Sequence, residues 1–390
     1  MELFGRPGST KPALMPSPHS DVSAFLNRIV YQLYARAQRP ADAPEPNDGI
    51  KVVDDPKDVD LILKSTDQFR KNYSLVSALG RSRFNADGHE WQARRDLTQP
   101  AYLEAGRTQN RTAVSATYND WLSKCRDITP QAIQTSLLAA STTIFHRVFG
   151  CSLDVERTMQ FFDHARSVIK ALQFFSWNQA APGELSQLTE QAHAVLRSYA
   201  AQASQSSEFS QVLEHIRGQA TGIPDFCPSE EFMMNFFAGV ETTAATLSWA
   251  IDRLGADQKA QSQLYDEVSR NAEHCPLLEC FINETMRYFP PIPFIVREVV
   301  STARLNGEEF GPGTLLLVSV VGVHHHPDYW DEPHIFDSKR PAFLQNTYDR
   351  MAFIPFLAGP RMCGGARLAR LELTEGLKCF IRMYSVKRAT

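Results

Sequence analysis

The sequence predicts a mainly helical protein with a small β region, folded as a single domain. Three observations favour this class. Apolar residues recur at helical spacing in one segment after another, strand-like stretches are few and short, and the 390 residues contain no internal repeat or low-complexity tract. Candidate functional residues extend from Trp91 to Cys363, which favours one large unit over two average domains.

Helices make up most of the predicted elements. Residues 1–19 hold several prolines and are expected to be irregular, so the domain is expected to span residues 20–390. Helices are predicted at 21–36, 56–65, 90–103, 111–124, 130–148, 155–172, 184–203, 208–219, 232–254, 277–289 and 368–383. Strands are predicted at 50–53, 299–305, 309–310, 314–320 and 384–387.

Composition excludes several function classes. The net charge of −4 gives no basic surface of the kind that nucleic-acid binding needs, so no nucleic-acid partner is expected. No segment approaches the roughly 20 apolar residues of a membrane span, and the proline-rich start of the chain resembles neither a signal peptide nor an anchor. The seven cysteines are odd in number and lack paired zinc spacing, which fits a reducing compartment. A cytoplasmic protein without a membrane anchor is therefore expected.

Three adjacent histidines, His324, His325 and His326, directly precede Pro327. Adjacent side chains do not face a common point on a helix or a strand, so a polar turn is favoured here over a metal site. The six cysteines other than Cys363 are expected to be small buried apolar residues.

The most specific motif is the glycine-rich segment 356–365, which reads FLAGPRMCGG. It places Cys363 in a loop just before a predicted helix, with Arg361 two positions ahead. Glycines let such a loop fold closely around a sulfur and aim amide N–H groups at it, which favours the thiolate. Arg361 is placed to pair with an anionic group such as a haem propionate. The alternative is a structural cysteine in a turn, which the number of matching positions disfavours.

This segment resembles the signature Phe-x-x-Gly-x-Arg-x-Cys-x-Gly of the cytochrome P450 family of haem-thiolate monooxygenases. The matching residues are Phe356, Gly359, Arg361, Cys363 and Gly365. The resemblance implies that Cys363 is the axial ligand of a haem b iron, that the fold is that of a cytochrome P450, and that the other signature residues contact the haem.

A second segment, Ala238-Gly239-Val240-Glu241-Thr242-Thr243, interrupts an apolar helix with polar residues. Neighbouring threonines favour helix poorly and their hydroxyls can bond back to a carbonyl one turn earlier, so a distorted helix is expected. Alone, the segment is as consistent with an ordinary buried helix. In the family this segment faces bound oxygen, so the resemblance implies that Glu241 and Thr242 relay protons there and that Ala238 contacts the haem.

Glu284 and Arg287 lie three residues apart on one face of a predicted helix. As an exposed pair they would mean little. The family, however, carries a Glu-x-x-Arg pair that is joined by a later arginine and supports the cysteine loop. Arg340, which follows the segment Pro333-His334-Ile335-Phe336, matches that third member. The resemblance thus gives these three residues a structural role.

Two further matches imply contacts with the haem propionates. Trp91 and Arg95 stand one helical turn apart and match a tryptophan and arginine of the family's third helix. Arg297 matches an arginine on the strand that follows the Glu-x-x-Arg helix. Considered one at a time, each arginine is more typical of a solvated surface charge.

The substrate is the least specified part of the prediction. By position, the resemblance implies a pocket lined by residues 75–84, by Phe174, Phe175 and Trp177, and by Phe237, Ala238, Val240, Ile292 and Phe294. These residues are mostly apolar, which suggests a small hydrophobic substrate that is hydroxylated or otherwise oxidised. Helix-spaced apolar residues are also typical of an ordinary core.

No glycine-rich fingerprint for a flavin or nicotinamide occurs in the chain, so the electrons are expected from a separate ferredoxin or flavodoxin with its reductase. The expected docking surface over Cys363 carries Arg361, Arg367, Arg370 and Lys378, which are equally consistent with plain solvated charges. The chain is expected to be a monomer of the soluble bacterial type. Too few residues follow Cys363 for the family's usual C-terminal β-hairpin, so that hairpin is expected to be absent.

Two other functions remain open. A peroxide-driven peroxygenase would use the same haem, although the Glu241-Thr242 pair argues against it because that route needs no proton relay. A non-catalytic haem-binding or gas-sensing protein would also bind haem through Cys363. The sequence does not identify the substrate, the position of its oxidation, or which redox partner acts.

Overall fold

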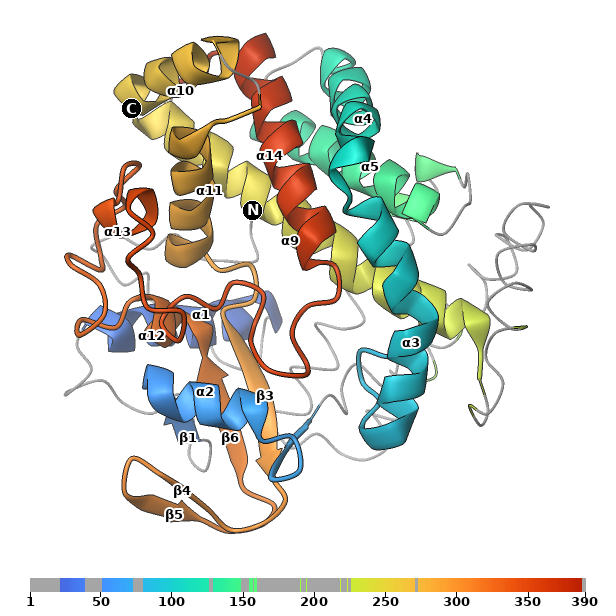
Figure 1. The fold of residues 1–390 in the computed structure, drawn as a ribbon, viewed down its shortest axis with the longest axis vertical. Coiled ribbons are helices and arrows are strands. Elements are labelled where there is room, and N and C mark those ends of the chain that lie inside the picture. Colours follow the sequence, from blue (N-terminus) through green and yellow to red (C-terminus); the bar gives the residue numbers. More distant parts are fainter. Residues whose placement is uncertain are drawn as a thin grey trace.

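The computed structural model describes residues 22–38, 51–72, 80–125, 129–148, 226–270 and 273–387, with a few isolated residues between 154 and 223. This part of the chain forms a large helical region beside a small sheet region (Figure 1). The prediction of a mainly helical fold with a small β region is confirmed.

Helix α9, Pro228–Ala256, runs through the middle of the helical region (Figure 1). It is apolar on several sides because other helices surround it. Its Phe232 and Phe236 are at most 1% exposed and meet the ring of Phe145 edge-on. The helices packed around it are α3 (Gly88–Ala105), α4 (Arg111–Ser123), α5 (Pro130–Val148), α10 (Gln258–Arg270), α11 (Pro276–Tyr288) and α14 (Ala366–Met383).

A four-stranded sheet lies below these helices in Figure 1, in the order β1-β6-β3-β2. Strands β1 and β6 are parallel, while β3 is antiparallel to both β6 and β2. The strands are β1 (Lys51–Val53), β2 (Phe69–Lys71), β3 (Phe294–Val299) and β6 (Leu315–Ser319). A separate hairpin joins β4 (Ala303–Leu305) to β5 (Glu308–Phe310) through Asn306 and Gly307, both with positive φ, as an Asn-Gly hairpin turn requires.

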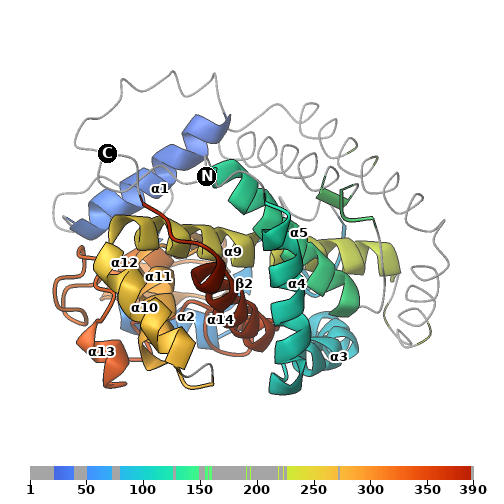
Figure 2. The same ribbon diagram turned by 90° about the horizontal axis from the view of Figure 1, so that it is seen from above.

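Helices cover both faces of the sheet because its side chains alternate between them. Helix α2 (Pro56–Lys64) packs on the face that carries Val53, Leu316 and Val318. Helix α1 (Val22–Gln38) packs on the opposite face, together with α12 (Val320–His324) (Figure 2). A further short helix, α13 (Pro341–Leu344), and a 3₁₀ turn, Thr108–Asn110, complete the described elements.

Most of the predicted elements are confirmed to within a few residues. The strand predicted at 299–305 is wrong, because the chain turns between β3 and β4. The strand predicted at 384–387 is also wrong: Val386 pairs instead with the side chains of Gln258 and Gln261, at 2.8 Å in each hydrogen bond. Strand β2 and helix α10 were not predicted. The irregular segment predicted at 1–19 and most of the helices predicted at 155–172, 184–203 and 208–219 lie outside the described residues.

The prediction of a polar turn at the three histidines is wrong. His324 and His325 are at most 2% exposed. His324 Nε2 accepts the amide N–H of Ile354 at 2.9 Å, and the His325 ring stacks on His334. Burial lowers the pKa of His324 to about 3, so this side chain is neutral, and among the described residues no group of histidines, cysteines and acids is arranged to hold a metal ion. Of the six other cysteines, Cys280 and Cys379 are buried, three are half-buried, and Cys151 lies outside the described residues.

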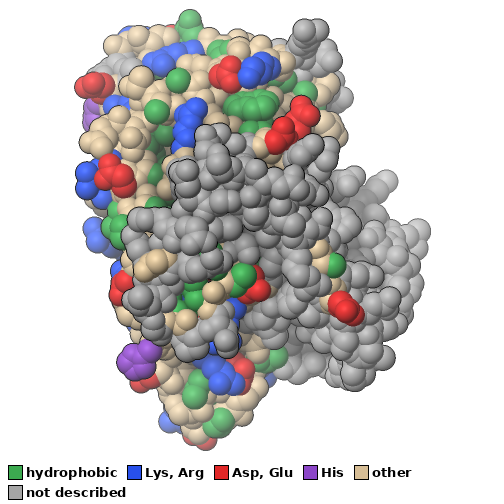
Figure 3. Space-filling model, turned by 90° about the vertical axis from the view of Figure 1, so that its right-hand side faces the viewer, with side chains coloured by type: hydrophobic (Ala, Val, Ile, Leu, Met, Phe, Trp, Pro, Cys, Tyr) green, Lys and Arg blue, Asp and Glu red, His purple; other side chains and the backbone are tan. Residues whose placement is uncertain are grey.

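Within the part of the chain that the structure describes, no helix combines the length and the apolar character that crossing a bilayer requires. On the face drawn in Figure 3, the described basic and acidic side chains are interspersed rather than gathered into one basic area.

Candidate functional site

The cysteine loop is held close to the end of helix α2. The amide N–H of Cys363 donates to the carbonyl oxygen of Phe356 at 2.9 Å, which closes the loop. Gly359 has a φ of +70°, and a Cβ added there would lie 2.3 Å from the carbonyl oxygen of Leu63. Only glycine combines this backbone conformation with so close an approach. The spacing of Phe356, Gly359 and Cys363 is therefore the spacing that this loop geometry requires.

The side chain of Cys363 is exposed, and desolvation by neighbouring groups raises the pKa of its thiol. The Gly365 amide and the positive charges of Arg83 and Lys71 act in the opposite direction and lower the pKa of the thiol. Cys363 is thus an exposed thiol with an amide donor and two cations close to it.

Three cations gather beside the cysteine loop. Lys71 on β2 is directly opposite Arg297 on β3 in the sheet. The pKa of Lys71 lies well below its ordinary value, first because of burial and then because of Arg361 and Arg297; Asp87 acts in the opposite direction. Arg297 is 2% exposed, its guanidinium donates to the Val296 carbonyl at 2.9 Å, and no described carboxylate forms an ion pair with it. Like charges placed opposite each other are unfavourable unless an anion joins them.

Arg361 and Trp91 form the other edge of this group. The Arg361 guanidinium pairs with Asp87 at 2.8 Å and also donates to the Ala86 carbonyl. It lies 4.4 Å from the centre of the Trp91 ring, and the Arg95 guanidinium lies 5.7 Å from the same ring. The side chain of Arg95 is 41% exposed. The predicted Trp91-Arg95 pair is thus brought together with the cysteine loop through Arg361.

The polar segment of α9 is formed as one continuous helix. Thr242 Oγ1 donates to the Ala238 carbonyl at 3.2 Å, and Thr243 Oγ1 donates to the Gly239 carbonyl at 3.3 Å. These are the back-bonds predicted from sequence, but the predicted distortion is not seen, because the helix continues unbroken from Pro228 to Ala256. A threonine can make this bond without breaking a helix. Glu241 and Thr242 are both half-buried.

The predicted three-residue charge network is present and buried. Glu284 accepts two hydrogen bonds from Arg287, at 2.7 and 2.8 Å, and two from Arg340, at 2.7 and 3.0 Å. Both carboxylate oxygens are thereby used in bidentate pairs, and the Asp337 amide adds a fifth donor at 2.9 Å. Arg287 also donates to the carbonyls of His324, Pro333 and Ile335. The network joins α11 to the segment ahead of the cysteine loop.

Sequence comparison finds similarity to cytochrome P450s. Residues 229–390 match the model of the cytochrome P450 family. The chain is 30% identical over 185 residues to cytochrome P450 CYP72A616 of Paris polyphylla, which covers 44% of this chain and 36% of that protein. It is 36% identical over 153 residues to human cytochrome P450 4F2, covering 35% of this chain and 29% of that protein. The matched part therefore spans about a third of each relative's length.

Structure comparison extends the similarity over most of the chain. A cytochrome P450 of Thermus thermophilus matches with a TM-score of 0.67 and 21% identity, over 86% of this chain and 85% of that one. CYP109E1 of Bacillus megaterium, in complex with testosterone, matches with a TM-score of 0.71 and 19% identity, over 92% of this chain and 90% of that one. Residues 229–390 thus resemble the cytochrome P450 family in sequence, and most of the chain has the fold of solved cytochrome P450s. Because the similar proteins include plant, mammalian and bacterial P450s, the predicted bacterial type does not follow from this similarity.

The similarity to cytochrome P450s implies a haem cofactor, and the residues present fit one. A haem carries two propionates and binds a thiolate at its iron. The exposed thiol of Cys363 offers a sulfur for the iron. The buried Arg297, with Lys71 and Arg361 beside it, offers positive charge for carboxylates.

The predicted substrate residues differ in their surroundings. Val240 is 1% exposed and packs in the main core, while Phe237 is half-buried against that core. Ile292 is 45% exposed and Phe294, at the start of β3, is half-buried. The remaining predicted pocket residues lie mostly outside the described residues. The assignment of a substrate pocket therefore stays a prediction.

Sequence reasoning did not single out three polar residues of this site. Lys71 was missed because β2 was not predicted. Asp87 was missed because it lies 274 positions from Arg361, its ion-pair partner. Arg83 donates to Thr98 Oγ1 at 2.9 Å and to Gln99 Oε1 at 2.8 Å, and Gln99 in turn donates to the carbonyl of Gly364, next to the ligand. The cluster of basic residues at 81 and 83 was the available signal.

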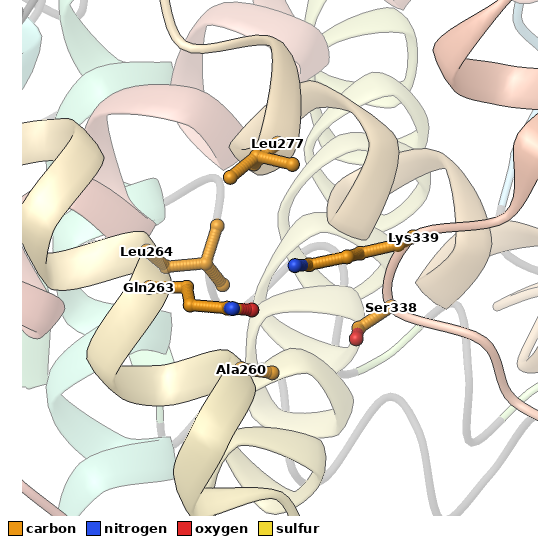
Figure 4. A pocket seen from close by; sticks show the side chains of 6 residues that line it. All are labelled: Ala260, Gln263, Leu264, Leu277, Ser338 and Lys339. Carbon is orange, nitrogen blue, oxygen red and sulfur yellow. The ribbon is translucent and has the colours of Figure 1, made fainter.

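A small pocket lies apart from the cysteine site, between α10, the start of α11 and the segment before α13 (Figure 4). None of the residues of the cysteine loop or of the basic group lines it, and it is too small to hold a cofactor. Its lining residues are Ala260, Gln263, Leu264, Leu277, Ser338 and Lys339.

Proposed function

We propose that this protein is a haem-thiolate monooxygenase that oxidises a small hydrophobic molecule with electrons from a separate ferredoxin or flavodoxin. The single observation that carries the proposal is the exposed thiol of Cys363 beside buried, like-charged cations. Haem bound through a thiolate would supply oxygen activation, because the thiolate donates electron density that favours O–O bond cleavage. A cytoplasmic, monomeric enzyme of the soluble type remains part of the proposal.

In this proposal each group of residues has one task. Cys363 ligates the iron, while Phe356, Gly359 and Gly365 shape the loop around it. Trp91, Arg95, Arg297, Arg361 and Lys71 orient the haem by its propionates, because charge-assisted hydrogen bonds to a carboxylate fix direction as well as position.

With haem bound, Glu241 would bring a proton from solvent and the Thr242 hydroxyl would pass it on. Ala238, on the same helix, would help to hold the haem, and Phe237, Val240, Ile292 and Phe294 would contact the substrate. The apolar character of these side chains favours a hydrophobic substrate, which binds by leaving water.

The test of this function is the spectrum of the purified, reduced protein with carbon monoxide. The thiolate-ligated form is expected to show the red-shifted absorption maximum that gives the family its name, and Cys363→Ala is expected to lose it. Cys280→Ala, at a buried cysteine outside the site, serves as the matched control. A wild-type protein that binds no haem, or keeps its spectrum unchanged after Cys363→Ala, would contradict the proposal. Full turnover with hydrogen peroxide alone would indicate a peroxygenase instead.

Thr242→Ala is expected to lower product formation roughly 10- to 100-fold, because proton delivery at one position contributes on that order or more. The electrons are then expected to leave as hydrogen peroxide, so the ratio of product to consumed reductant falls. This ratio is measured with a ferredoxin system and a substrate found by a spin-state screen. Ser248→Ala is the control, since Ser248 makes the same kind of back-bond further along α9. An unchanged ratio would remove Thr242 from the proton path.

Lys71→Met is expected to weaken haem binding about tenfold, because one of the cations that faces the propionates is lost. The same change is expected to leave the cofactor-free protein equally or more stable, since it relieves repulsion from Arg297 and Arg361. Both quantities are measured, by haem titration and by thermal unfolding of the cofactor-free protein. Lys51→Met is the control, as Lys51 is an exposed lysine of the same sheet. Equal haem affinity in the two variants would exclude a role for Lys71.

A further inference from the structure

Two adjacent glutamates at the start of α9 hold the segment 80–87, which precedes α3. Glu230 accepts the amide N–H of Arg81 at 2.8 Å. Glu231 accepts the amide N–H of Arg83, at 3.0 and 3.3 Å to its two oxygens. Gly80 makes this contact possible: its φ is +129°, and a Cβ there would lie 2.7 Å from the Glu230 side chain. The backbone of the segment is thus fixed at two points by side chains of a distant helix.

Glu231 also takes part in a fully buried ion pair. Arg94 on α3 and Glu231 on α9 are both 0% exposed and meet at 2.8 Å. Arg94 also pairs with Glu90 at 2.8 Å and donates to the Arg81 carbonyl at 3.0 Å. A buried pair of this kind is costly to break, because each partner would be left charged without compensation. The pair therefore ties α9, α3 and the segment 80–87 to one relative position.

Internal hydrogen bonds hold the segment 80–87 in one conformation, so that a shift at one of its ends also moves the other end. The amide of Ser82 donates to Asn85 Oδ1 at 2.8 Å, and the Asn85 side-chain amide donates to the Gly80 carbonyl at 2.8 Å. The Ala86 amide closes the turn by donating to the Ser82 carbonyl at 2.9 Å. Such a self-bonded turn moves as one piece.

At its far end the same segment holds Arg361. The Ala86 carbonyl and the Asp87 carboxylate both accept from the Arg361 guanidinium, in the ion pair described above. Arg361 is 8% exposed, so its position depends on these partners rather than on solvent. A continuous series of bonds therefore leads from the first turn of α9 to the cation two residues before Cys363.

We propose that Glu230 and Glu231 are positioning residues that place Arg361 at the haem edge by fixing the segment 80–87. The inference rests on the proposed haem site, and neither glutamate contacts the haem in it. Because α9 also carries Glu241 and Thr242, the same contacts would keep these two residues and the Arg361 cation in a fixed relative position when haem is bound. Loss of either glutamate loosens Arg361 without removing its charge.

The first experiment measures haem transfer from the loaded protein to an excess of apomyoglobin. Glu231→Gln and Arg361→Gln are each expected to speed haem loss roughly 10- to 100-fold, as is typical for residues that orient a ligand or its supporting partner. The double variant is expected to be no faster than Arg361→Gln alone, because Glu231 acts through Arg361. Independent sites this far apart would instead give additive effects. Additivity would overturn the proposal.

If Glu231→Gln does not fold, Glu230→Gln still tests the proposal. Glu230 accepts one hydrogen bond from the segment, from the Arg81 amide, so its loss disturbs the fold less. It is expected to speed haem loss less than Glu231→Gln and to show the same non-additivity with Arg361→Gln. Hydrogen exchange of the amides in residues 80–87 is expected to rise in both glutamate variants. Asp252→Asn, at the other end of α9, is the matched control and is expected to change neither quantity. Unchanged exchange at residues 80–87 would also overturn the proposal.

The carbon monoxide spectrum separates this inference from the proposed function. The glutamate variants are expected to keep the thiolate spectrum that Cys363→Ala loses. If the wild-type protein lacks that spectrum, the proposed function fails. If the spectrum is present but the effects on haem loss are additive, only the positioning role fails.

Discussion

Glu284→Gln is expected to lower the free energy of unfolding by about 3–5 kcal/mol, because it leaves two buried arginines without their carboxylate. Glu284, Arg287 and the Arg340 side chain are at most 5% exposed, so solvent cannot replace the lost charge. Since the net stability of a folded domain is only about 5–15 kcal/mol, a loss of this size removes much of it. The change is measured by urea unfolding of the haem-loaded protein.

A matched substitution on the same helix distinguishes this network from a general effect of charge. Glu279 lies on α11 as Glu284 does but is exposed, so Glu279→Gln is expected to change the free energy of unfolding by less than about 0.5 kcal/mol. Because Arg340 donates to the carbonyls of Asp331 and Ile335, the loss at Glu284 is also expected to loosen the chain ahead of the cysteine loop. Equal stability of the two variants would show that the network contributes little.

Local patterns in the sequence predicted the parts of this protein that depend on near neighbours. The glycine at position 359 is required by one turn of backbone, and the Glu284-Arg287 pair by one turn of helix, so both could be recognised from spacing. Arg340 was identified through the family resemblance, since nothing local connects it to Glu284. Its four hydrogen-bonded contacts with the carboxylate and two carbonyls are formed only by the folded chain.

The residues that sequence reasoning missed owe their surroundings to pairing across the chain. Lys71 is significant because β2 lies beside β3, and a strand of three residues has too weak a pattern to predict. Glu231 reads as an ordinary acid of a helix's first turn until Arg94 and the Arg83 amide are brought to it. His324 reads as polar in the sequence, but the Ile354 amide satisfies its ring nitrogen inside the core. Tertiary partners, not local preference, decide each of these cases.

Glu372 is expected to make the protein less stable as the pH rises from about 4.5 to about 8. Burial on α14 raises the pKa of this carboxyl from 4.5 to about 8, against hydrogen bonds from Ser141 and Tyr118 that lower it. The folded protein therefore keeps the proton while the unfolded chain loses it. The stability that the protonated Glu372 contributes is complete below about pH 4.5 and is lost as the pH rises through about 8. At about 1.4 kcal/mol for each unit of pKa, the loss reaches about 5 kcal/mol.

Glu372→Gln isolates this contribution because the amide stays neutral and can still accept the Tyr118 hydroxyl, which lies 3.0 Å from Glu372 Oε2. The difference in unfolding free energy between wild type and variant is expected to shift in favour of the variant as the pH rises from about 5 to about 9. The comparison uses the difference between the two proteins because buried histidines change stability with the opposite sign. The pKa of His324 is lowered to about 3, so stability rises between about pH 3 and 6.5 in both proteins.

Tyr118→Phe gives an independent check on the cause. The phenol donates to the carboxylate, so its removal is expected to raise the pKa of Glu372 further and to move the loss of stability to higher pH. Because Ser141 lies 2.9 Å from the same phenol, Ser141→Ala is expected to shift the loss in the same direction. A wild-type protein whose stability follows the same pH curve as Glu372→Gln would show that Glu372 is ionised in the folded state.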